Sequence, residues 1–254
     1  MKIAWVTGGG TGIGRALSEA LYREGHWVVI SGRRQDALTQ AVEQIKTGHT
    51  SGDLWALPGD VTEAAFVEDL PRKVRARWGE IDWLINNAGA NTNHSFQQSS
   101  PEEFEQAFRT NCLSAILCAR AVLPAMRARG SGSIVNVSSI LGRWASPDSS
   151  SYSVSKYALA GFTDALRQEV AGTGVHVMGV YPGFIRTAMT LPFVAPGSPR
   201  ARMGKSPESM AAAILKGLHR QKREVLYPWY VPIALRLHAW FPATLEKLRR
   251  LFKR

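Results

Sequence analysis

Short apolar runs alternate with longer amphipathic stretches along most of this 254-residue chain, and this alternation limits the possible folds severely. Apolar runs of about four to eight residues predict buried strands, whereas apolar residues that recur every three or four positions predict helices. Strands that alternate with helices form a parallel sheet covered on both faces. We therefore expect an α/β fold: a single domain built on a doubly wound parallel sheet, with helices on both faces.

The expected elements follow one another in regular order. Helices are expected at residues 12–24, 35–46, 63–78, 101–129 and 151–171. Strands are expected at residues 3–7, 27–31, 54–58, 83–85, 133–137, 175–181 and 225–227.

Residues 184–206 break the pattern, because they are rich in proline and glycine and show little periodicity. A loop of this length in a compact domain is usually functional or disordered. It follows an expected strand, at the sheet edge where α/β proteins bind ligands. Met189, Leu191, Phe193 and Val194 would give a lid an apolar inner face. The segment is therefore either a substrate lid or a surface loop without a function.

The net charge of +11 is distributed unevenly. Residues 1–199 carry 18 Lys/Arg and 17 Asp/Glu, whereas residues 200–254 carry 13 and 3. The basic character therefore belongs to the C-terminal fifth of the chain and needs its own explanation. The balanced charge of the rest argues against nucleic-acid binding as the main role.

Two features bear on the compartment. Cys112 and Cys118 match neither a C-x-x-C pair nor a zinc motif, which is typical of reduced thiols in a reducing compartment. The N-terminus holds one lysine and a short apolar stretch, which predicts a first strand and not a signal peptide. We expect a cytoplasmic protein without a metal site.

A glycine-rich run joins the first expected strand to the first expected helix. Glycines let the backbone approach a phosphate closely, and a helix N-terminus offers free N–H groups and the positive end of a dipole. The spacing is G-x-x-x-G-x-G and not G-x-G-x-x-G, so a mere tight turn is the alternative to a dinucleotide site. The cofactor contacts expected here are Thr7, Gly8, Gly10, Thr11, Gly12, Ile13 and Gly14.

The end of the second expected strand predicts which dinucleotide is bound. NAD-binding proteins usually place an acidic residue there, whereas arginine accommodates the 2′-phosphate of NADP. Here Arg33 and Arg34 follow the strand, and the first acidic residue is Asp36, in the next helix. Ser31 could add a hydrogen bond. We therefore expect NADP(H), against the alternative of a solvated basic turn.

Tyr152 and Lys156 are four residues apart and so share one face of an expected helix. A free tyrosine has a pKa of ~10 and is a poor proton donor near neutral pH. A cation held ~4 Å away in an effective dielectric of ~20 favours the phenolate by about 4 kcal/mol. The spacing therefore predicts that Lys156 lowers the pKa of Tyr152.

In combination, these motifs resemble the short-chain dehydrogenase/reductase family, over most of residues 1–190. The resemblance implies a Rossmann-type domain that transfers a hydride between nicotinamide and a carbonyl or alcohol carbon. The matching segments, in family order, are Thr7-Gly8-x-x-x-Gly12-Ile13-Gly14, Asp60-Val61, Asn86-Asn87-Ala88-Gly89, Asn111, Ser139, Tyr152-x-x-x-Lys156, and Pro182-Gly183 with Thr187.

The resemblance also implies catalytic roles. Tyr152 would be the general acid, and Lys156 would lower its pKa and bind the nicotinamide ribose. Ser139 would bind the substrate oxygen; Ser138 is the competing assignment, but the thirteen-residue spacing to Tyr152 favours Ser139. Asn111 would hold a water that links Lys156 to solvent.

Further cofactor contacts are implied in the same way. Asp60 and Val61 would contact adenine, and Asn87 would lie near the adenine ribose. The nicotinamide carboxamide would lie against Ile185 and Thr187. The adjoining Ala88, Gly89, Pro182 and Gly183 complete the implied set. Family members are often dimers or tetramers, so a homo-oligomer is expected.

The segment from residue 227 to 254 departs from the family pattern. We expect residues 1–226 to form the catalytic domain and 227–254 a basic amphipathic extension. An aromatic stretch is followed by an expected helix with Leu245, Leu248, Leu251 and Phe252 on one side, opposite basic residues. Such a segment is typical of contact with an anionic membrane surface, and packing on the domain or on another subunit is the alternative.

The predicted function is NADPH-dependent reduction of a ketone or aldehyde to an alcohol. The apolar loop and Trp144 favour a lipophilic substrate. The alternatives are an NAD(P)-dependent alcohol dehydrogenase that works in the oxidative direction and a catalytically silent NADP(H) sensor.

Overall fold

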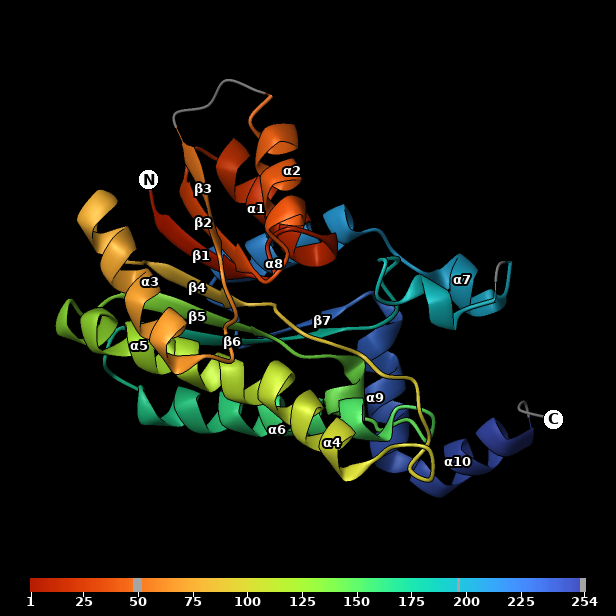
Figure 1. Ribbon diagram of the computed structural model, residues 1–254. Helices are drawn as coiled ribbons and strands as arrows, with labels where there is room; N and C mark the ends of the chain where they lie inside the picture. The colour runs from red at the N-terminus through yellow and green to blue at the C-terminus, as the bar shows by residue number, and fades with distance from the viewer. Residues whose placement is uncertain (48–51, 196, 252–254) are drawn as a thin grey trace.

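The structure, a computed structural model, describes residues 1–47, 52–195 and 197–251. Within this part of the chain, seven parallel strands form one sheet in the order β3-β2-β1-β4-β5-β6-β7 (Figure 1). The predicted doubly wound parallel sheet is confirmed, and every strand lies within one residue of its predicted bounds. The strands are β1 Ile3–Thr7, β2 Trp27–Gly32, β3 Asp53–Pro58, β4 Trp83–Asn86, β5 Gly132–Val137, β6 Val175–Pro182 and β7 Glu224–Tyr227.

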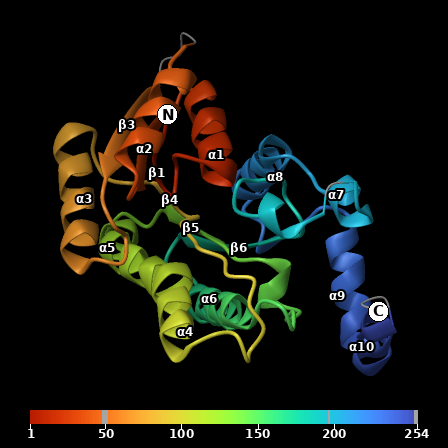
Figure 2. The same cartoon turned by 45° about the vertical axis from the view of Figure 1, so that its right-hand side comes forward.

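Helices cover both faces of the sheet (Figures 1 and 2). One face carries α1 Gly12–Arg23, α2 Gln35–Ile45 and α8 Pro207–His219. The other carries α3 Ala64–Arg77, α4 Pro101–Phe108, α5 Ser114–Ala128 and α6 Ser150–Glu169.

Side-chain alternation along the strands divides the core into two layers. In β1, Ala4 and Val6 pack among the residues of the α1, α2 and α8 layer. Ile3 and Trp5 pack among the residues of the opposite layer. Both faces of the strand are therefore buried, which explains why it is a continuous apolar run in the sequence.

The strand order reverses between β1 and β4. The chain runs outward from β1 through β2 to β3 and then returns to pair β4 with the other side of β1. In open α/β sheets, such a reversal leaves a crevice at the carboxyl ends of the strands, where ligands bind. The glycine-rich run after β1 and the Asn86–Gly89 turn after β4 meet at this point.

The helix predicted at residues 101–129 is not continuous. A π-helical turn at Arg109–Leu113 separates α4 from α5. The backbone N–H of Ser114 donates to the carbonyl oxygen of Arg109, five residues earlier, so one extra residue is inserted. Single π turns of this kind are frequent at functional sites. The inserted turn carries Asn111, whereas helical periodicity alone predicted a regular helix.

Between β6 and α8, residues 184–195 and 197–206 contain two short helical segments, Leu191–Phe193 and α7 Pro199–Met203. Two backbone hydrogen bonds join the ends of this segment. The N–H of Arg186 donates to the carbonyl of Lys205 at 2.8 Å, and the N–H of Lys205 donates to the carbonyl of Phe184 at 3.1 Å. The start and the end of the segment are therefore held together. Helix α8 follows it directly, and the sequence patterns above did not identify this helix.

Two helices end the chain: α9 Tyr230–Trp240 and α10 Pro242–Leu251. They lie beside α7 at one end of the molecule (Figure 2). In the part of the chain that the structure describes, no helix is both long and apolar enough to cross a membrane. Of the predicted apolar stripe, Leu245 is half-buried; the side chains of Leu248 and Leu251, and all of Phe252, lie outside the described residues.

Candidate active site

A cavity of about 630 Å³ opens at the carboxyl ends of the strands. It brings together most of the residues that the sequence predicted for the cofactor and for catalysis. The predicted residues that line it are Gly8, Gly10, Thr11, Gly12, Ile13, Arg33, Arg34, Asp60, Val61, Asn87, Ala88, Gly89, Ser139, Tyr152, Lys156, Pro182, Gly183, Ile185 and Thr187.

Two predicted cofactor residues lie behind the cavity wall and shape it instead. The Thr7 hydroxyl accepts the backbone N–H groups of Asn87 and Ala88, at 3.0 and 2.9 Å. Gly14 lies against the preceding turn, where a Cβ atom would come within 2.2 Å of the Gly8 carbonyl oxygen. Thr7 therefore fixes the turn after β4, and Gly14 lets α1 pack closely on the loop.

Ser31 does not face the cavity. Its side chain is fully buried, and its hydroxyl accepts the indole N–H of Trp5 at 2.9 Å. The physical reason is the pleat of β2, which places this side chain on the same face of the sheet as Val29 and Trp5. The expectation that Ser31 hydrogen-bonds the cofactor phosphate is therefore not supported by its position.

The first turn of α1 fits a phosphate group. Thr11 caps the helix without a side-chain hydrogen bond, and the first turn holds no acidic residue. Gly8 and Gly12 have φ angles of +65° and +54°, which favour glycine. The backbone N–H groups and the positive end of the helix dipole therefore face the cavity without a competing side chain.

Arg33 and Arg34 lie between β2 and α2, next to the glycine-rich loop. Both are exposed and line the cavity. The Arg34 guanidinium lies 3.5 Å from the Thr11 hydroxyl, so it reaches over the glycine-rich loop. Two exposed cations at this position would fit a dianionic 2′-phosphate.

Tyr152 lies on α6 and faces the cavity. Burial raises the pKa of its phenol to about 12, and a hydrogen bond with Ser139 acts in the opposite direction. The Ser139 hydroxyl also accepts the backbone N–H of Leu141 at 3.1 Å, which holds the serine at the start of the turn Ile140–Gly142. Tyr152 is therefore protonated across the neutral range.

Lys156 lies one helical turn further on, with its Nζ atom 5.6 Å from the centre of the Tyr152 ring. The ammonium donates to the carbonyl of Val137 at 3.0 Å. Burial lowers the pKa of Lys156 to about 8. Burial thus sets the direction of the Tyr152 pKa in this structure, and the predicted lowering of that pKa by Lys156 stays a prediction.

Asn111 lies behind Lys156 and not on the cavity wall. Its amide bonds both backbone groups of Ala90, at 2.9 Å each, and donates to the Ser155 hydroxyl at 2.9 Å. At Gly89, a Cβ atom would come within 2.9 Å of Asn111 Oδ1 and 3.5 Å of Lys156 Nζ. The amide and the ammonium thus converge on Gly89, and the water relay stays a prediction.

The two candidate serines make different contacts. Ser138 is buried, and its hydroxyl donates to the carbonyl of Lys156 at 2.9 Å, so it fastens β5 to α6. Ser139 faces Tyr152 instead. This arrangement supports Ser139 as the residue that binds substrate oxygen.

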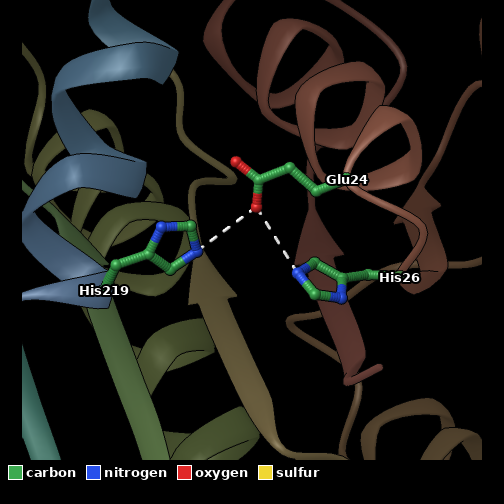
Figure 3. A group of neighbouring side chains, drawn as sticks. All are labelled: Glu24, His26 and His219. Atoms are coloured by element: carbon green, nitrogen blue, oxygen red, sulfur yellow. Dashed lines mark ion pairs between the residues drawn. The ribbon is translucent and has the colours of Figure 1, made fainter.

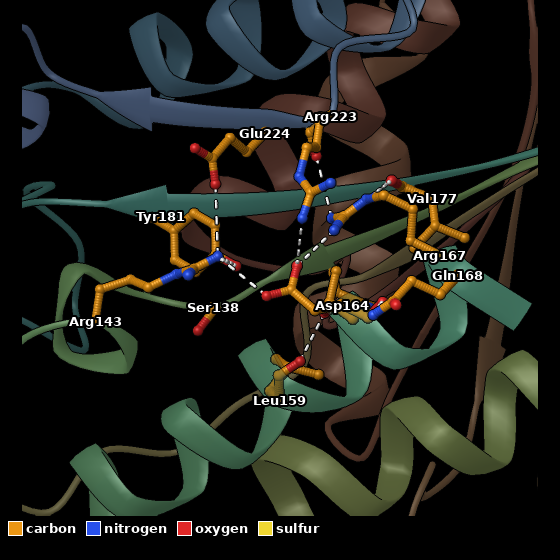
Figure 4. Close-up of polar contacts among 12 residues, drawn as sticks. Ser138, Arg143, Leu159, Asp164, Arg167, Gln168, Val177, Tyr181, Arg223 and Glu224 are labelled. Atoms are coloured by element: carbon orange, nitrogen blue, oxygen red, sulfur yellow. Dashed lines mark hydrogen bonds and ion pairs between the residues drawn. The ribbon is translucent and has the colours of Figure 1, made fainter. Parts of the chain in front are cut away.

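A charged cluster fixes the segment that carries Ser139 (Figure 4). The Arg143 guanidinium, just after the Ile140–Gly142 turn, donates to the Tyr181 hydroxyl at 2.7 Å. It also lies 3.5 Å from the carboxylates of Asp164 on α6 and Glu224 on β7. Arg143 therefore ties the Ser139 turn to three neighbouring elements.

The sequence did not predict that Tyr230 lines the cavity. The Tyr230 hydroxyl accepts the backbone N–H of Phe184 at 3.1 Å, and the next residue, Val231, is fully buried. The predicted C-terminal extension therefore reaches the site at the first turn of α9. In the sequence, only the high aromatic content of this extension could have suggested the contact of Tyr230 with the cavity.

A second polar cluster lies away from the cavity and joins α1, β2 and α8 (Figure 3). Glu24 lies 3.4 Å from His26 and 3.2 Å from His219, and the three ligand-type atoms lie within 4.8 Å of one another. However, the backbone N–H of Lys2 donates to Nδ1 of His26. The neutral ring therefore carries its proton on Nε2, toward Glu24, which favours a hydrogen bond over a metal ligand.

Comparison with known proteins identifies the family. The family model of short chain dehydrogenases matches residues 2–195. A ketoacyl reductase, HetN, of a Nostoc species is 36% identical over 226 residues, which cover 89% of this chain and 78% of that protein. An uncharacterized oxidoreductase of Staphylococcus aureus is 33% identical over 221 residues, or 87% of this chain and 92% of that one.

Solved structures agree. A short-chain dehydrogenase from Streptomyces avermitilis has a TM-score of 0.83 at 29% identity, covering 99% of this chain and 98% of that one. A short-chain dehydrogenase from Sphingobium yanoikuyae, in complex with NADPH, has a TM-score of 0.82 at 25% identity, covering 98% and 96%. The chain belongs to the short-chain dehydrogenase/reductase family, and its site is that of an NAD(P)(H)-dependent oxidoreductase.

Proposed function

We propose that this protein reduces a lipophilic ketone or aldehyde to an alcohol with NADPH. The observation that carries the proposal is one cavity that holds Ser139, Tyr152 and Lys156 next to the open N-terminus of α1 and the Arg33–Arg34 pair. NADPH supplies the hydride when it is bound. The resident side chains must then orient the carbonyl and supply the proton.

The roles follow from protonation states. The Ser139 hydroxyl holds the carbonyl oxygen toward Tyr152. Tyr152 holds a proton at neutral pH, since its pKa lies above the neutral range. It gives this proton to the oxygen as the oxygen gains negative charge and the alcohol forms. The Lys156 ammonium, with a pKa of about 8, stabilises the phenolate that is left.

The choice of NADPH over NADH rests on Arg33 and Arg34 and on the lack of an acidic residue at the end of β2. Two solved relatives support it. The Sphingobium yanoikuyae enzyme was solved with NADPH, and an L-sorbose reductase from Gluconobacter frateurii with NADPH and L-sorbose. The latter has a TM-score of 0.76 at 27% identity, covering 85% of this chain and 89% of that one.

The lipophilic substrate class is supported by the substrate end of the cavity. Leu141, Phe184, Met189 and Met203 line it.

We further propose a cytoplasmic homo-oligomer whose C-terminal segment, residues 227–254, contacts an anionic membrane surface. Its basic charge supports that contact.

The test is NADPH and NADH oxidation with short, medium and long aldehydes and ketones, measured for the wild type and for Tyr152→Phe. We expect kcat/KM with NADPH to rise with chain length, and the variant to lose about 10²- to 10⁴-fold in rate. Equal or better use of NADH would overturn the cofactor assignment. Preference for a small polar ketose would overturn the substrate class.

A further inference from the structure

The mouth of the cavity is apolar. Met189 and Met203 line the cavity, yet they are 41% and 47% exposed. Residues that are both lining and exposed mark a place where the cavity opens to the outside, and the one marked here is apolar, unlike the one at Arg33 and Arg34. Leu191 and Phe193, in the helical turn that follows Met189, also leave much of their surface exposed. A substrate that enters here passes over apolar side chains.

Helix α9 continues this apolar surface. Its first residue, Tyr230, lines the cavity, and the preceding Trp229 is exposed. Ile233 and Leu237 follow Trp229 at intervals of four residues, so the three side chains lie on one face of the helix. The exposed Trp240 and Phe241 extend the same stripe to the far end of α9. We call these residues, with Met189, Leu191, Phe193 and Met203, the rim surface.

The segments that carry the rim surface lie at the same end of the molecule. Both views show α7 and α9 there, with α10 beyond α9 (Figures 1 and 2). One ring contact joins α9 to the segment that follows Ser139: His238 stacks on Trp144, with ring centres 4.7 Å apart and planes inclined by 12°. This contact, with the Tyr230 hydrogen bond to Phe184, fixes α9 against the domain, with its first turn at the cavity.

The charge around the rim surface selects its partner. Arg202, Arg236 and Lys247 are exposed, and none of them forms an ion pair within the described part of the chain. Residues 200–254 as a whole carry 13 basic and 3 acidic residues. A second copy docked here would bring the same positive charge. An anionic bilayer offers both a complementary charge and an apolar interior for tryptophan and leucine.

We propose that the rim surface lies in the interface of an anionic lipid bilayer and opens the cavity directly toward it. Helix α9 would lie in the plane of the interface, with its apolar stripe among the acyl chains and its arginine at the headgroups. The substrate would then be a carbonyl lipid dissolved in the bilayer. This inference rests on the proposed reductase activity and names its substrate class more closely.

The test uses vesicles of phosphatidylcholine alone and with phosphatidylserine, with a long-chain ketone dissolved in them and a short water-soluble ketone as reference. Two variants weaken the proposed contact: Trp240→Ser within the rim surface and Arg236→Glu beside it. Each has a matched control on another surface. Phe96→Ser replaces a side chain that is 74% exposed, close to the 77% of Trp240, and Arg127→Glu reverses an exposed arginine on α5.

The wild type should sediment with the anionic vesicles and turn over the vesicle-bound ketone faster than on neutral vesicles. Arg236→Glu and Trp240→Ser should weaken vesicle binding about tenfold and reduce turnover of the vesicle-bound ketone in proportion. Both should leave turnover of the soluble ketone unchanged, as should the two control variants.

The outcomes separate this inference from the proposed function. Normal turnover of the soluble ketone without vesicle binding would overturn the membrane inference alone. Vesicle binding without NADPH-dependent turnover of any ketone would instead overturn the reductase. A Trp240→Ser variant that changes the oligomer size in sedimentation equilibrium, with no change in vesicle binding, would assign the rim surface to a second copy and overturn the inference.

Discussion

At the floor of the cavity Lys156 is buried, with Asn111 behind it, and both are hydrogen-bonded to the backbone. At its mouth Met189 and Met203 leave apolar surface exposed, as Trp229 and Trp240 do along α9. The floor is fixed by the protein itself, since Lys156 and Asn111 each have defined partners. The apolar side chains at the mouth stay exposed in this chain, so their burial requires a second surface, such as a membrane or another protein. Chemistry is therefore expected to depend on the floor, and substrate delivery on the mouth.

The largest effect is expected from a change at the floor. Ser139→Ala should lower kcat by about 10²- to 10³-fold, because the donor to the developing negative charge is lost. NADPH affinity, measured by fluorescence titration, should not change.

Ser138→Ala is the matched control for this change. It removes the hydrogen bond to the carbonyl of Lys156 and should cost about 1 kcal/mol of unfolding free energy, with little change in kcat. A larger loss of kcat in Ser138→Ala than in Ser139→Ala would reverse the two assignments.

A smaller effect is expected at the phosphate end of the floor. Replacing both Arg33 and Arg34 by serine should raise KM for NADPH about 10- to 100-fold and leave KM for NADH nearly unchanged, because only the 2′-phosphate contacts are lost. Arg23→Ser, an exposed arginine on α1, is the control. An equal rise for both cofactors would show that the pair does not recognise the 2′-phosphate.

The pH dependence of reduction should report on Lys156. Its pKa is lowered by burial to about 8, so the ammonium is present below that pH and lost above it. The value of kcat/KM for a soluble ketone should therefore fall above pH 8, by about tenfold per unit at most. Lys156→Arg should move the fall to higher pH, because arginine keeps its charge. A profile that stays level well above pH 8 in the wild type would exclude this role.

The smallest effects are expected on α9, where the comparison can be made within one helix. Val231→Ala removes a fully buried side chain and should lower the free energy of unfolding by about 1–3 kcal/mol. Ile233→Ala changes the exposed stripe and should cost less than about 0.5 kcal/mol. Denaturant titration measures both. Equal losses would show that the stripe is packed on the protein and not free to bind a membrane.

The features that could be predicted from the sequence are local ones. The spacing of Tyr152 and Lys156 fixes their common helix face, and the glycine run between the first strand and the first helix predicts a phosphate loop. The strands were predictable because both their faces are buried. The π turn around Asn111 was not, because one inserted residue leaves the helical pattern of apolar residues nearly unchanged.

Long-range features were the ones missed. The strand pleat that turns Ser31 toward Trp5 involves a neighbour 26 residues away. The raised pKa of Tyr152 depends on how deeply the folded chain buries the ring, which its neighbours in sequence do not determine. Tyr230 reaches the cavity only because β7 brings α9 back to the end of β6. Each of these properties arises from tertiary packing.

The central claim is that this cavity moves a hydride from NADPH to a carbonyl carbon while Tyr152 supplies the proton. The direct measurement is mass spectrometry of the alcohol formed from a long-chain ketone and NADPH deuterated at the transferable position of the nicotinamide. We predict one deuterium on the carbinol carbon with the wild type and almost no labelled product with Tyr152→Phe. Tight NADPH binding without any label transfer by the wild type, or equal transfer by Tyr152→Phe, would contradict the claim.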